Sequence, residues 1–356
     1  MRIAMLGTRG VPARYSGFET CVEEVGRRLV ARGHEVTVYC RGSGPDRHLG
    51  MRLVHLPAPR LKVAETLVHT LFSVVHASRQ RYDSVVLFNA ANAVLLPLVR
   101  APMAVHVDGL EWKRAKWGPV GKRWYLASER LAVRWADTLI ADAAGISAYY
   151  RDRYGADTRL ISYGAPIVGG PDPERLSSMG LSPAGFHLIV ARFEPENNID
   201  LMLEGYRRSS IGLPLVVVGD VFYRSAYARE VRARYSGVPG VRFVGGVWDQ
   251  ELLDSLYAGA ATVLHGHSVG GTNPSLLRAM GAGATVLAFD VTFNREVLGD
   301  TGRFFSDPDG LAELLRSHAA GDLPALGDRA RGRARERYVW DDVARAYEDL
   351  CREISA

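Results

Sequence analysis

Short apolar runs alternate with longer amphipathic segments along all 356 residues of the chain. A strand that is buried on both faces is apolar throughout, and strands that alternate with helices form a mostly parallel sheet. The pattern therefore predicts an α/β protein. The spacing of Val22, Val25 and Leu29 predicts a helix over residues 18–32. The predicted strands are residues 3–6, 35–39, 51–56, 84–88, 103–107, 138–141, 159–161, 187–191, 215–218, 241–244, 261–264 and 285–289.

This pattern of strands and helices occurs twice, and the chain is too long for one typical hydrophobic core. We therefore expect two Rossmann-like domains. Residues 164–185 are rich in proline, glycine and serine, and we expect them to connect the domains. Ligands of open α/β sheets bind at the carboxyl ends of the strands, so the loops that follow the strands are the candidate sites.

Composition narrows the classes of function. Lys and Arg number 44 and Asp and Glu 39, so the net charge is +5, which suits an anionic ligand or a membrane surface without demonstrating either. The cysteines Cys21, Cys40 and Cys351 form no CxxC pair, so neither a disulfide framework nor a structural zinc is expected. No apolar stretch reaches the roughly 18–20 residues that span a bilayer. We expect a cytoplasmic protein, at most peripheral at the inner face of the membrane.

A polar, glycine-rich turn follows the strand predicted at residues 261–264 and precedes a helical segment. The turn consists of Gly270, Gly271, Thr272, Asn273 and Pro274. A helix N-terminus has unpaired N–H groups and a positive dipole end, so the turn suits a phosphate or the diphosphate of a sugar nucleotide. The alternative is an ordinary connection in which Pro274 occupies the first helical turn, where a missing N–H costs nothing.

A second candidate group follows the strand predicted at residues 187–191. It contains Arg192, Glu194, Asn197 and Asn198. Arginine presents a fixed fork of donors that fits a diphosphate. Alternatively, Arg192 pairs with a neighbouring glutamate at the surface, a contact worth about 0–1 kcal/mol.

The first loop, GTRGVPARYSGFE, contains glycines but not the GxGxxG spacing of dinucleotide-binding proteins. The segment YCRGSG at residues 39–44 also lacks an acidic residue to bind a ribose. A dehydrogenase is therefore disfavoured. We interpret the loop as backbone that approaches a ligand, with Gly17 at the start of the helix, and a plain β–α turn is the alternative.

Residues 111–137 interleave basic and aromatic side chains, which suits an anionic membrane surface or a lipid-diphosphate acceptor. The alternative is an amphipathic helix with its tryptophans in the core. Nucleic acid is not expected as a partner, because the charge is modest and no recognition motif is present. The side chains are Lys113, Arg114, Lys116, Lys122, Arg123, Arg130 and Arg134, with Trp112, Trp117, Trp124 and Trp135.

We expect no metal and no cofactor. The histidines His106, His265 and His267 lack the spacing of metal ligands. Asp307 and Asp309 imitate a metal-binding DxD motif, but we interpret this segment as a turn.

Five segments carry a resemblance to a known family. They are GTRGVPARYSGFETCVEE from Gly7, VDGLEWKRAKW from Val107, RFEPENNID from Arg192, HSVGGTNPSLLRAMGAG from His267 and FNREVLGD from Phe293. Together they resemble the retaining family 4 glycosyltransferases of the GT-B fold. More narrowly, they resemble the bacterial branch that includes dTDP-rhamnose-dependent rhamnosyltransferases of polysaccharide biosynthesis.

The resemblance implies two Rossmann-like domains that face each other across a cleft. Residues 1–168 would bind the acceptor and residues 169–335 the nucleotide sugar, while residues 336–356 would form a helix that packs on the first domain. Asp108 and Arg192 would be catalytic. The acceptor would contact Arg14, Tyr15, Phe18, Glu111 and Trp112. The donor would contact Gly17, Arg192, Glu194, Asn198, Val247, Gly270, Gly271, Thr272, Asn273 and Arg278.

The chain departs from the family pattern at Arg278, Asn198 and Ser16. Gly270 and Arg278 occupy the places of a Glu-x7-Glu pair, whose second glutamate would hold the ribose. Arg278 would add a phosphate contact, alter the nucleotide preference or mark a weakened enzyme. Asn198 replaces a lysine, and Ser16 stands where a glycine is commoner.

The resemblance implies a metal-independent hexosyltransferase that moves L-rhamnose from dTDP-rhamnose with retention. Attack would occur on the front face, with the leaving phosphate helping to deprotonate the acceptor, so catalysis would be positioning and electrostatic stabilisation. The acceptor would be a hydroxyl of a lipid-linked saccharide or a natural product. The alternatives are a degenerate nucleotide-binding partner protein and a sugar-nucleotide epimerase.

Overall fold

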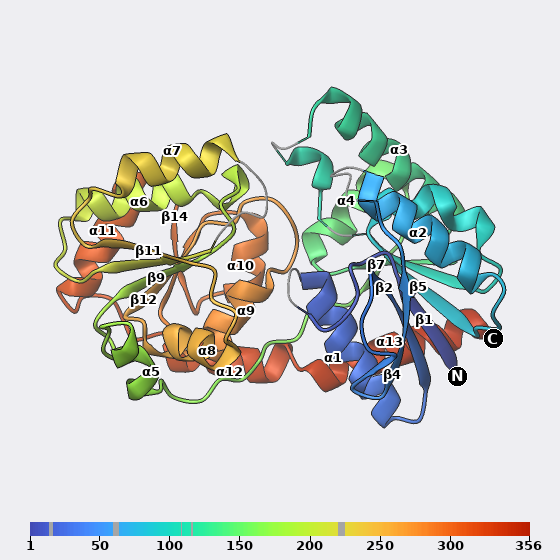
Figure 1. The fold of residues 1–356 in the computed structure, drawn as a ribbon. Helices are drawn as coiled ribbons and strands as arrows, with labels where there is room; N and C mark the ends of the chain where they lie inside the picture. Colours follow the sequence, from blue (N-terminus) through green and yellow to red (C-terminus); the bar gives the residue numbers. More distant parts are fainter. Residues whose placement is uncertain (14–16, 60–63, 108, 115–116, 220–224) are drawn as a thin grey trace. The chain divides into compact units, whose positions relative to one another are not determined.

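The computed structural model describes residues 1–13, 17–59, 64–107, 109–114, 117–219 and 225–356. The chain forms two compact units, Met1–Tyr163 with Trp340–Ala356, and Gly164–Val339 (Figure 1). The sequence places the boundaries at 168 and 335 instead. The difference arises because backbone hydrogen bonds hold residues 164–168 on the second unit: Ala165 N–H donates to the Tyr338 carbonyl at 2.7 Å.

The first unit is built on a sheet with the strand order β3-β4-β2-β1-β5-β6-β7-β8. β5 is buried throughout, and β1 and β2 over most of their length, so their apolar runs predict them. β3 is a two-residue edge strand antiparallel to β4, too short to leave a pattern in the sequence. The strands are β1 (Arg2–Leu6), β2 (Glu35–Arg41), β3 (Arg47–His48), β4 (Met51–Leu56), β5 (Ser84–Phe88), β6 (Met103–His106), β7 (Thr138–Ala141) and β8 (Arg159–Leu160).

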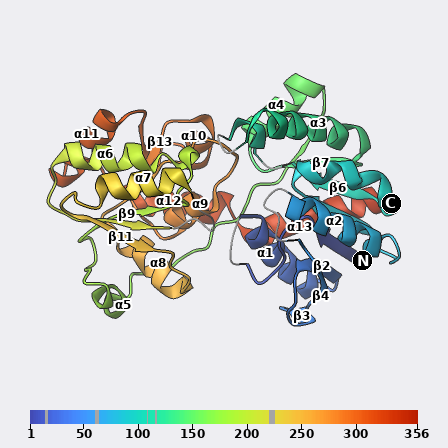
Figure 2. The same cartoon turned by 45° about the horizontal axis from the view of Figure 1, so that its top comes forward.

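Helices cover both faces of this sheet. They are α1 (Gly17–Ala31), α2 (Ala64–Ala77), η1 (Ala90–Leu98), η2 (Glu111–Lys113), α3 (Pro119–Trp135), α4 (Ala144–Tyr154) and α13 (Trp340–Ser355). η1 contacts both α2 and α3, whereas α1 packs against α13. In a parallel sheet, right-handed connections that move along the sheet in the same direction place their helices on the same face. Accordingly, α2 and α3 lie on the opposite face from α1 and α13 (Figure 1 and Figure 2).

α13 completes the first unit. Tyr347 is fully buried, and its hydroxyl lies 3.6 Å from Cys21 Sγ of α1. Glu348, also buried, accepts hydrogen bonds from His34 Nε2 at 2.8 Å and from Arg32 at 3.3 Å. Burial by itself would raise the pKa of Glu348, but these partners outweigh it and the pKa is lowered. The carboxylate therefore stabilises the docked helix at neutral pH, and this contribution is lost as the pH falls through the lowered pKa.

The second unit contains a parallel sheet with the strand order β11-β10-β9-β12-β13-β14. Its strands are β9 (His187–Val190), β10 (Leu215–Val218), β11 (Val241–Gly245), β12 (Thr262–His265), β13 (Val286–Phe289) and β14 (Arg303–Phe305). Its helices are α5 (Pro173–Ser178), η3 (Pro195–Asn197), α6 (Ile199–Ser209), α7 (Ala226–Tyr235), α8 (Gln250–Gly259), α9 (Pro274–Gly281), α10 (Thr292–Leu298), α11 (Pro308–Ala319) and α12 (Gly327–Arg337).

Residues 164–185, expected as a connection between the domains, belong to the second unit and contain α5. Asp172 caps this helix, since its Oδ1 accepts hydrogen bonds from the N–H groups of Glu174 at 3.0 Å and Arg175 at 3.2 Å. Pro173 occupies the first helical position, where no N–H is needed. The expectation was wrong because Asp172 and Pro173 begin a helix within this segment.

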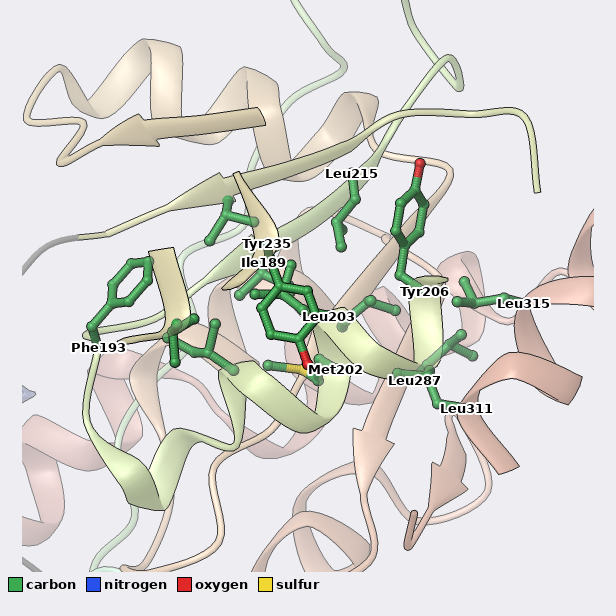
Figure 3. Packing of buried hydrophobic residues seen from close by; sticks show 14 of the residues in the cluster. Ile189, Phe193, Met202, Leu203, Tyr206, Leu215, Tyr235, Leu287, Leu311 and Leu315 are labelled. Carbon is green, nitrogen blue, oxygen red and sulfur yellow. The ribbon is translucent and has the colours of Figure 1, made fainter. Parts of the chain in front are cut away.

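A hydrophobic core fills the space between β9 and β10 and the helices α6, α7 and α11. Figure 3 shows Leu203 of α6 packed with Leu215 of β10 and Leu311 of α11. Each such leucine, fully buried, contributes about 1.5–3 kcal/mol. Phe193 extends this core to the loop that follows β9 and is also fully buried. Its burial fixes the backbone on either side of it, at Arg192 and Glu194.

Candidate functional site

The strand order of the second unit creates a switch point between β9 and β12. β10 and β11 follow β9 on one side, and β12, β13 and β14 lie on the other. At such a point the helices of the two halves leave on opposite faces, and a crevice opens at the carboxyl ends of the two strands. Two predicted site segments, residues 192–198 after β9 and residues 266–273 after β12, meet at this edge.

Side-chain amides bind the two loops to each other. Asn197 Oδ1 lies 2.7 Å from His267 Nδ1, and Asn197 Nδ2 donates to the Arg192 carbonyl at 2.7 Å. Asn198 Nδ2 donates to the Gly266 carbonyl at 2.8 Å. The position of Arg192 is therefore coupled to the loop that follows β12. Asn198 thus connects the two loops directly.

Further contacts tighten the same junction. The backbone N–H and the hydroxyl of Ser268 both bond to the Glu196 carbonyl at 2.9 Å. Asn294 at the start of α10 donates to the carbonyls of His267 at 3.0 Å and Phe289 at 2.8 Å. A Cβ at Gly266 would lie 2.2 Å from the Asn197 carbonyl oxygen, so only glycine permits this approach.

The glycine turn leads into the N-terminus of α9, as predicted. Gly270 has a φ of 149°, and a Cβ there would lie 2.9 Å from His267 Nε2. Asn273 caps α9, because its Oδ1 accepts from the backbone N–H of Ser275 at 2.9 Å and from its hydroxyl at 2.7 Å. Thr272 is buried and Gly271 half-buried. The positive end of the helix dipole is thus directed at the edge that also carries Arg192.

His265, at the end of β12, is neutral at physiological pH. Its burial is complete and lowers the pKa to about 4. Among the residues that the structure describes, no group of three or more His, Cys, Asp or Glu side chains is arranged to hold a metal ion. Asp307 of the DxD segment caps α11 by accepting from Gly310 N–H at 2.8 Å, and Asp309 pairs with Arg208 at 2.9 Å.

Arg278 is directed toward α8. Its Nε lies 3.1 Å from Asp254 Oδ1, and its Nη2 donates to Gln250 Oε1 at 2.8 Å. Burial raises the pKa of Asp254, and the Arg278 charge opposes that rise. The arginine thus ties α9 to the first turns of α8. Val247, expected at the donor, is half-buried and follows β11, the outermost strand of the sheet.

Arg232 of α7 was missed by the sequence analysis. Its guanidinium lies 4.9 Å from the ring centroid of Phe193, the residue that follows Arg192, and its Nη2 reaches the Gly219 carbonyl at 3.5 Å. The contact brings a second arginine to the carboxyl end of β9 and β10. No pattern in the sequence marks it, because it depends on the packing of α7.

In the first unit the loop after β1 is held by acids of α1. Glu19 accepts from the Arg9 N–H at 3.1 Å, and Glu23 accepts from the Ala13 N–H at 2.8 Å. Gly10 has a φ of 99°, and a Cβ there would lie 2.4 Å from Cys40 Sγ. This glycine therefore serves the packing of the loop. Gly17 begins α1 as predicted, whereas Arg14 and Tyr15 lie outside the described residues.

Phe18 packs into an aromatic cluster at the carboxyl ends of β5 and β6. Its ring lies 5.4 Å from Phe88 and 5.1 Å from His106, and Tyr163 stacks on the other side of His106 at 5.9 Å. Burial lowers the pKa of His106 to about 3, so this ring is neutral. Asp108, which follows β6, lies outside the described residues.

Glu111 and Trp112, expected at an acceptor site, make contacts within the first unit. The buried Glu111 carboxylate pairs with Arg114 Nε at 2.7 Å and accepts from Trp117 Nε1 at 3.1 Å. Trp112 packs against Tyr149, with 6.4 Å between ring centroids. These contacts hold η2 in place.

The tryptophans of the basic–aromatic segment divide between interior and surface. Trp112 and Trp117 are half-buried, whereas Trp124 and Trp135 are exposed. The interpretation that places them all in the core is therefore wrong. Of the helices in the described part of the chain, none has the length and apolar character needed to cross a membrane.

Comparison with known families decides what kind of protein carries this site. The glycosyl transferase 4-like domain matches residues 16–164, and the glycosyl transferases group 1 family matches residues 186–319. The chain is a glycosyltransferase. The group 1 match contains both loops of the switch point, and the 4-like match contains the loop that leads into α1.

Solved structures place this glycosyltransferase in the GT-B fold, as expected. Sucrose-phosphate synthase from Thermosynechococcus elongatus superposes with a TM-score of 0.84 at 21% identity, covering 99% of this chain and 98% of that one. Anabaena HepE in complex with UDP-glucose gives a TM-score of 0.80 at 18% identity, covering 98% and 99%. The O-antigen chain mannosyltransferase B of Escherichia coli is 27% identical over 176 residues. That match spans less than half of either protein, 47% of this chain and 45% of the relative.

Proposed function

We propose that this glycosyltransferase is a metal-independent hexosyltransferase that transfers L-rhamnose from dTDP-rhamnose, with retention, to a hydroxyl of a lipid-linked saccharide or a natural product. The observation that carries the proposal is the junction at the switch point of the second unit. There the Asn197–His267 contact holds the Arg192 loop beside the positive end of α9. A lipid-linked acceptor places the enzyme in the cytoplasm, at the inner face of the membrane.

The donor diphosphate is assigned to this junction. Arg192 contributes a planar fork of donors, and the glycine turn contributes backbone N–H groups at a helix N-terminus. HepE is described in complex with UDP-glucose, which supports a nucleotide-sugar donor for a protein of the same fold. The choice of dTDP and rhamnose rests on the resemblance of the motif segments.

In the proposed reaction, the bond between the anomeric carbon and the diphosphate oxygen breaks as the acceptor oxygen attacks from the same face. The acceptor proton passes to the leaving phosphate oxygen, so no separate base is required. The protein positions the two substrates and stabilises the charge that develops on the diphosphate. We assign that stabilisation to Arg192 and to the N–H groups of residues 270–272.

A thermal-shift panel with dTDP, UDP, GDP and NAD, each with and without EDTA, tests the proposal. A nucleotide at about 100 times its Kd stabilises the fold by about 2.7 kcal/mol. For a unit of this size we expect dTDP to raise Tm by about 5–10 °C, with or without EDTA. A larger shift with UDP or GDP contradicts the choice of base, and loss of the shift in EDTA contradicts metal independence. If no nucleotide shifts Tm, the assignment of a nucleotide-sugar donor to this junction is contradicted.

Arg278 gives a second test. Arg278→Glu places a carboxylate against Asp254, and we expect turnover of dTDP-rhamnose to fall about tenfold because the connection between α8 and α9 is lost. The double variant Arg278→Glu with Asp254→Arg restores the ion pair with its charges exchanged. It therefore separates the effect of Arg278 on the structure from its effect on donor binding. Recovery of Tm without recovery of the KM for the donor shows that Arg278 itself serves the nucleotide. If the single variant Arg278→Glu instead turns over dTDP-rhamnose faster than wild type, the wild-type chain is an enzyme of weakened activity.

A further inference from the structure

The first unit exposes large apolar side chains from three helical elements, α2, η1 and α3. Phe72 of α2 is 43% exposed, Val120 of α3 is 81% exposed and Trp124 of α3 is 41% exposed. The full set is Leu71, Phe72 and Val75 on α2, Leu98 at the end of η1, and Val120, Trp124 and Trp135 on α3. Single exposed apolar residues are ordinary, but grouped ones mark an interaction surface.

These elements are neighbours. η1 contacts both α2 and α3, and all three cover the same face of the sheet. On α2 the residues 71, 72 and 75 share one side, because positions three and four apart on a helix face the same way. On α3 the exposed positions 120, 124 and 127 follow the same spacing. Figure 2 shows α2 and α3 covering one side of the first unit.

Exposed basic side chains lie on α3, on η2 and just after η1. The exposed basic side chains are Arg100, Lys113, Lys122, Arg123, Arg130 and Arg134. The structure describes α3 in full, and its one acidic residue, Glu129, is buried and accepts hydrogen bonds from Tyr149 at 2.8 Å and Tyr154 at 2.7 Å. The outward face of α3 is thus purely cationic and apolar. On α6, by contrast, Glu204 neutralises the neighbouring arginines.

We propose that α2, the end of η1 and α3 form a membrane-docking face that binds the surface of an anionic lipid bilayer. Aromatic and aliphatic side chains enter the boundary between headgroups and acyl chains, while the flanking arginines and lysines contact the lipid phosphates. Exposed apolar groups next to positive charge that no acidic residue of α3 opposes favour an anionic bilayer, because such a surface offers both acyl chains and phosphates. This proposal rests on the membrane location in the proposed function, but vesicle binding is measured separately from nucleotide binding, so either can fail without the other.

Vesicle flotation of the full-length protein tests the proposal. We compare vesicles of phosphatidylglycerol and phosphatidylcholine with vesicles of phosphatidylcholine alone. Binding is expected only to the first kind. The triple variant R123E/R130E/R134E is expected to lower the partition coefficient about 100-fold or more, because each basic residue near an anionic surface contributes roughly fivefold. The double variant F72S/W124S is expected to release the protein at an ionic strength that wild type tolerates.

A matched charge change in the second unit is the control. The variant R229E/R335E/R337E alters three exposed arginines of α7 and α12 and is expected to float like wild type. Equal losses in both triple variants overturn the proposal, because binding then reflects net charge alone. Failure to bind anionic vesicles, or equal binding to neutral ones, also overturns it. If F72S/W124S dissociates a dimer seen by size-exclusion chromatography and vesicles are not bound, the face joins two copies of the chain.

Discussion

Replacing Arg192 with alanine is expected to raise the Kd for dTDP about 10- to 100-fold and to lower turnover of dTDP-rhamnose about 100- to 1,000-fold. The larger effect on turnover follows because the negative charge on the diphosphate grows as the sugar departs. The backbone of Arg192 is fixed by the buried Phe193 and by Asn197, so no other side chain moves into its place. Calorimetric titration and release of dTDP measure the two quantities.

Two variants accompany this experiment. Arg192→Lys keeps the positive charge but loses the planar arrangement of N–H donors. We expect it to recover only part of the turnover that is lost in Arg192→Ala. Arg229→Ala removes an exposed arginine of α7 and is expected to leave both quantities unchanged. Unaltered dTDP affinity in Arg192→Ala would remove Arg192 from the donor site. If dTDP proves not to be the nucleotide, the same measurements apply to the one that stabilises the protein most.

Gly266→Ala is expected to abolish most activity while leaving every charged group in place. Its new Cβ would lie 2.2 Å from the Asn197 carbonyl oxygen and 2.8 Å from Met202 Cε, so the two loops must separate. We expect a loss of about 1–3 kcal/mol of stability, or roughly 3–10 °C in Tm. Displacement of the Arg192 loop by an ångström is expected to lower turnover about 100-fold.

Gly332→Ala is the matched control, because nothing lies within 4 Å of the added Cβ and the residue is helical. It is expected to leave turnover unchanged and to raise Tm slightly through the lower entropy of the unfolded chain. Normal turnover in Gly266→Ala would contradict a role for close contact between the loops.

Most of the fold was predictable because its strands are buried. All twelve predicted strands exist, with bounds that differ by at most two residues from those of the structure. β3 and β14 were missed. β3 (Arg47–His48) contains no apolar residue and β14 (Arg303–Phe305) only two, so neither forms an apolar run. β8 is equally short, but the apolar Ile161 follows Leu160 and extends its run. The helix at Asp172 was overlooked although an N-cap followed by proline was visible in the sequence.

The candidate site was predictable as far as it depends on strand ends. Arg192 and Gly270 follow strands directly, and parallel strands bring their carboxyl ends to one edge. The contact between Asn197 and His267 joins residues 70 positions apart and has no sequence signature. The same holds for the pair of Arg278 with Asp254, which depends on how α8 and α9 pack.

The place of α13 in the first unit has a consequence for synthesis. Domains usually fold as they leave the ribosome, the N-terminal one first, at about 5–20 residues per second. Here residues 164–339 are translated before α13, so the first unit waits roughly 10–35 s for its last helix. Meanwhile the α1 surface that receives Tyr347 is uncovered. The second unit, although later in the chain, can therefore be the first to finish folding.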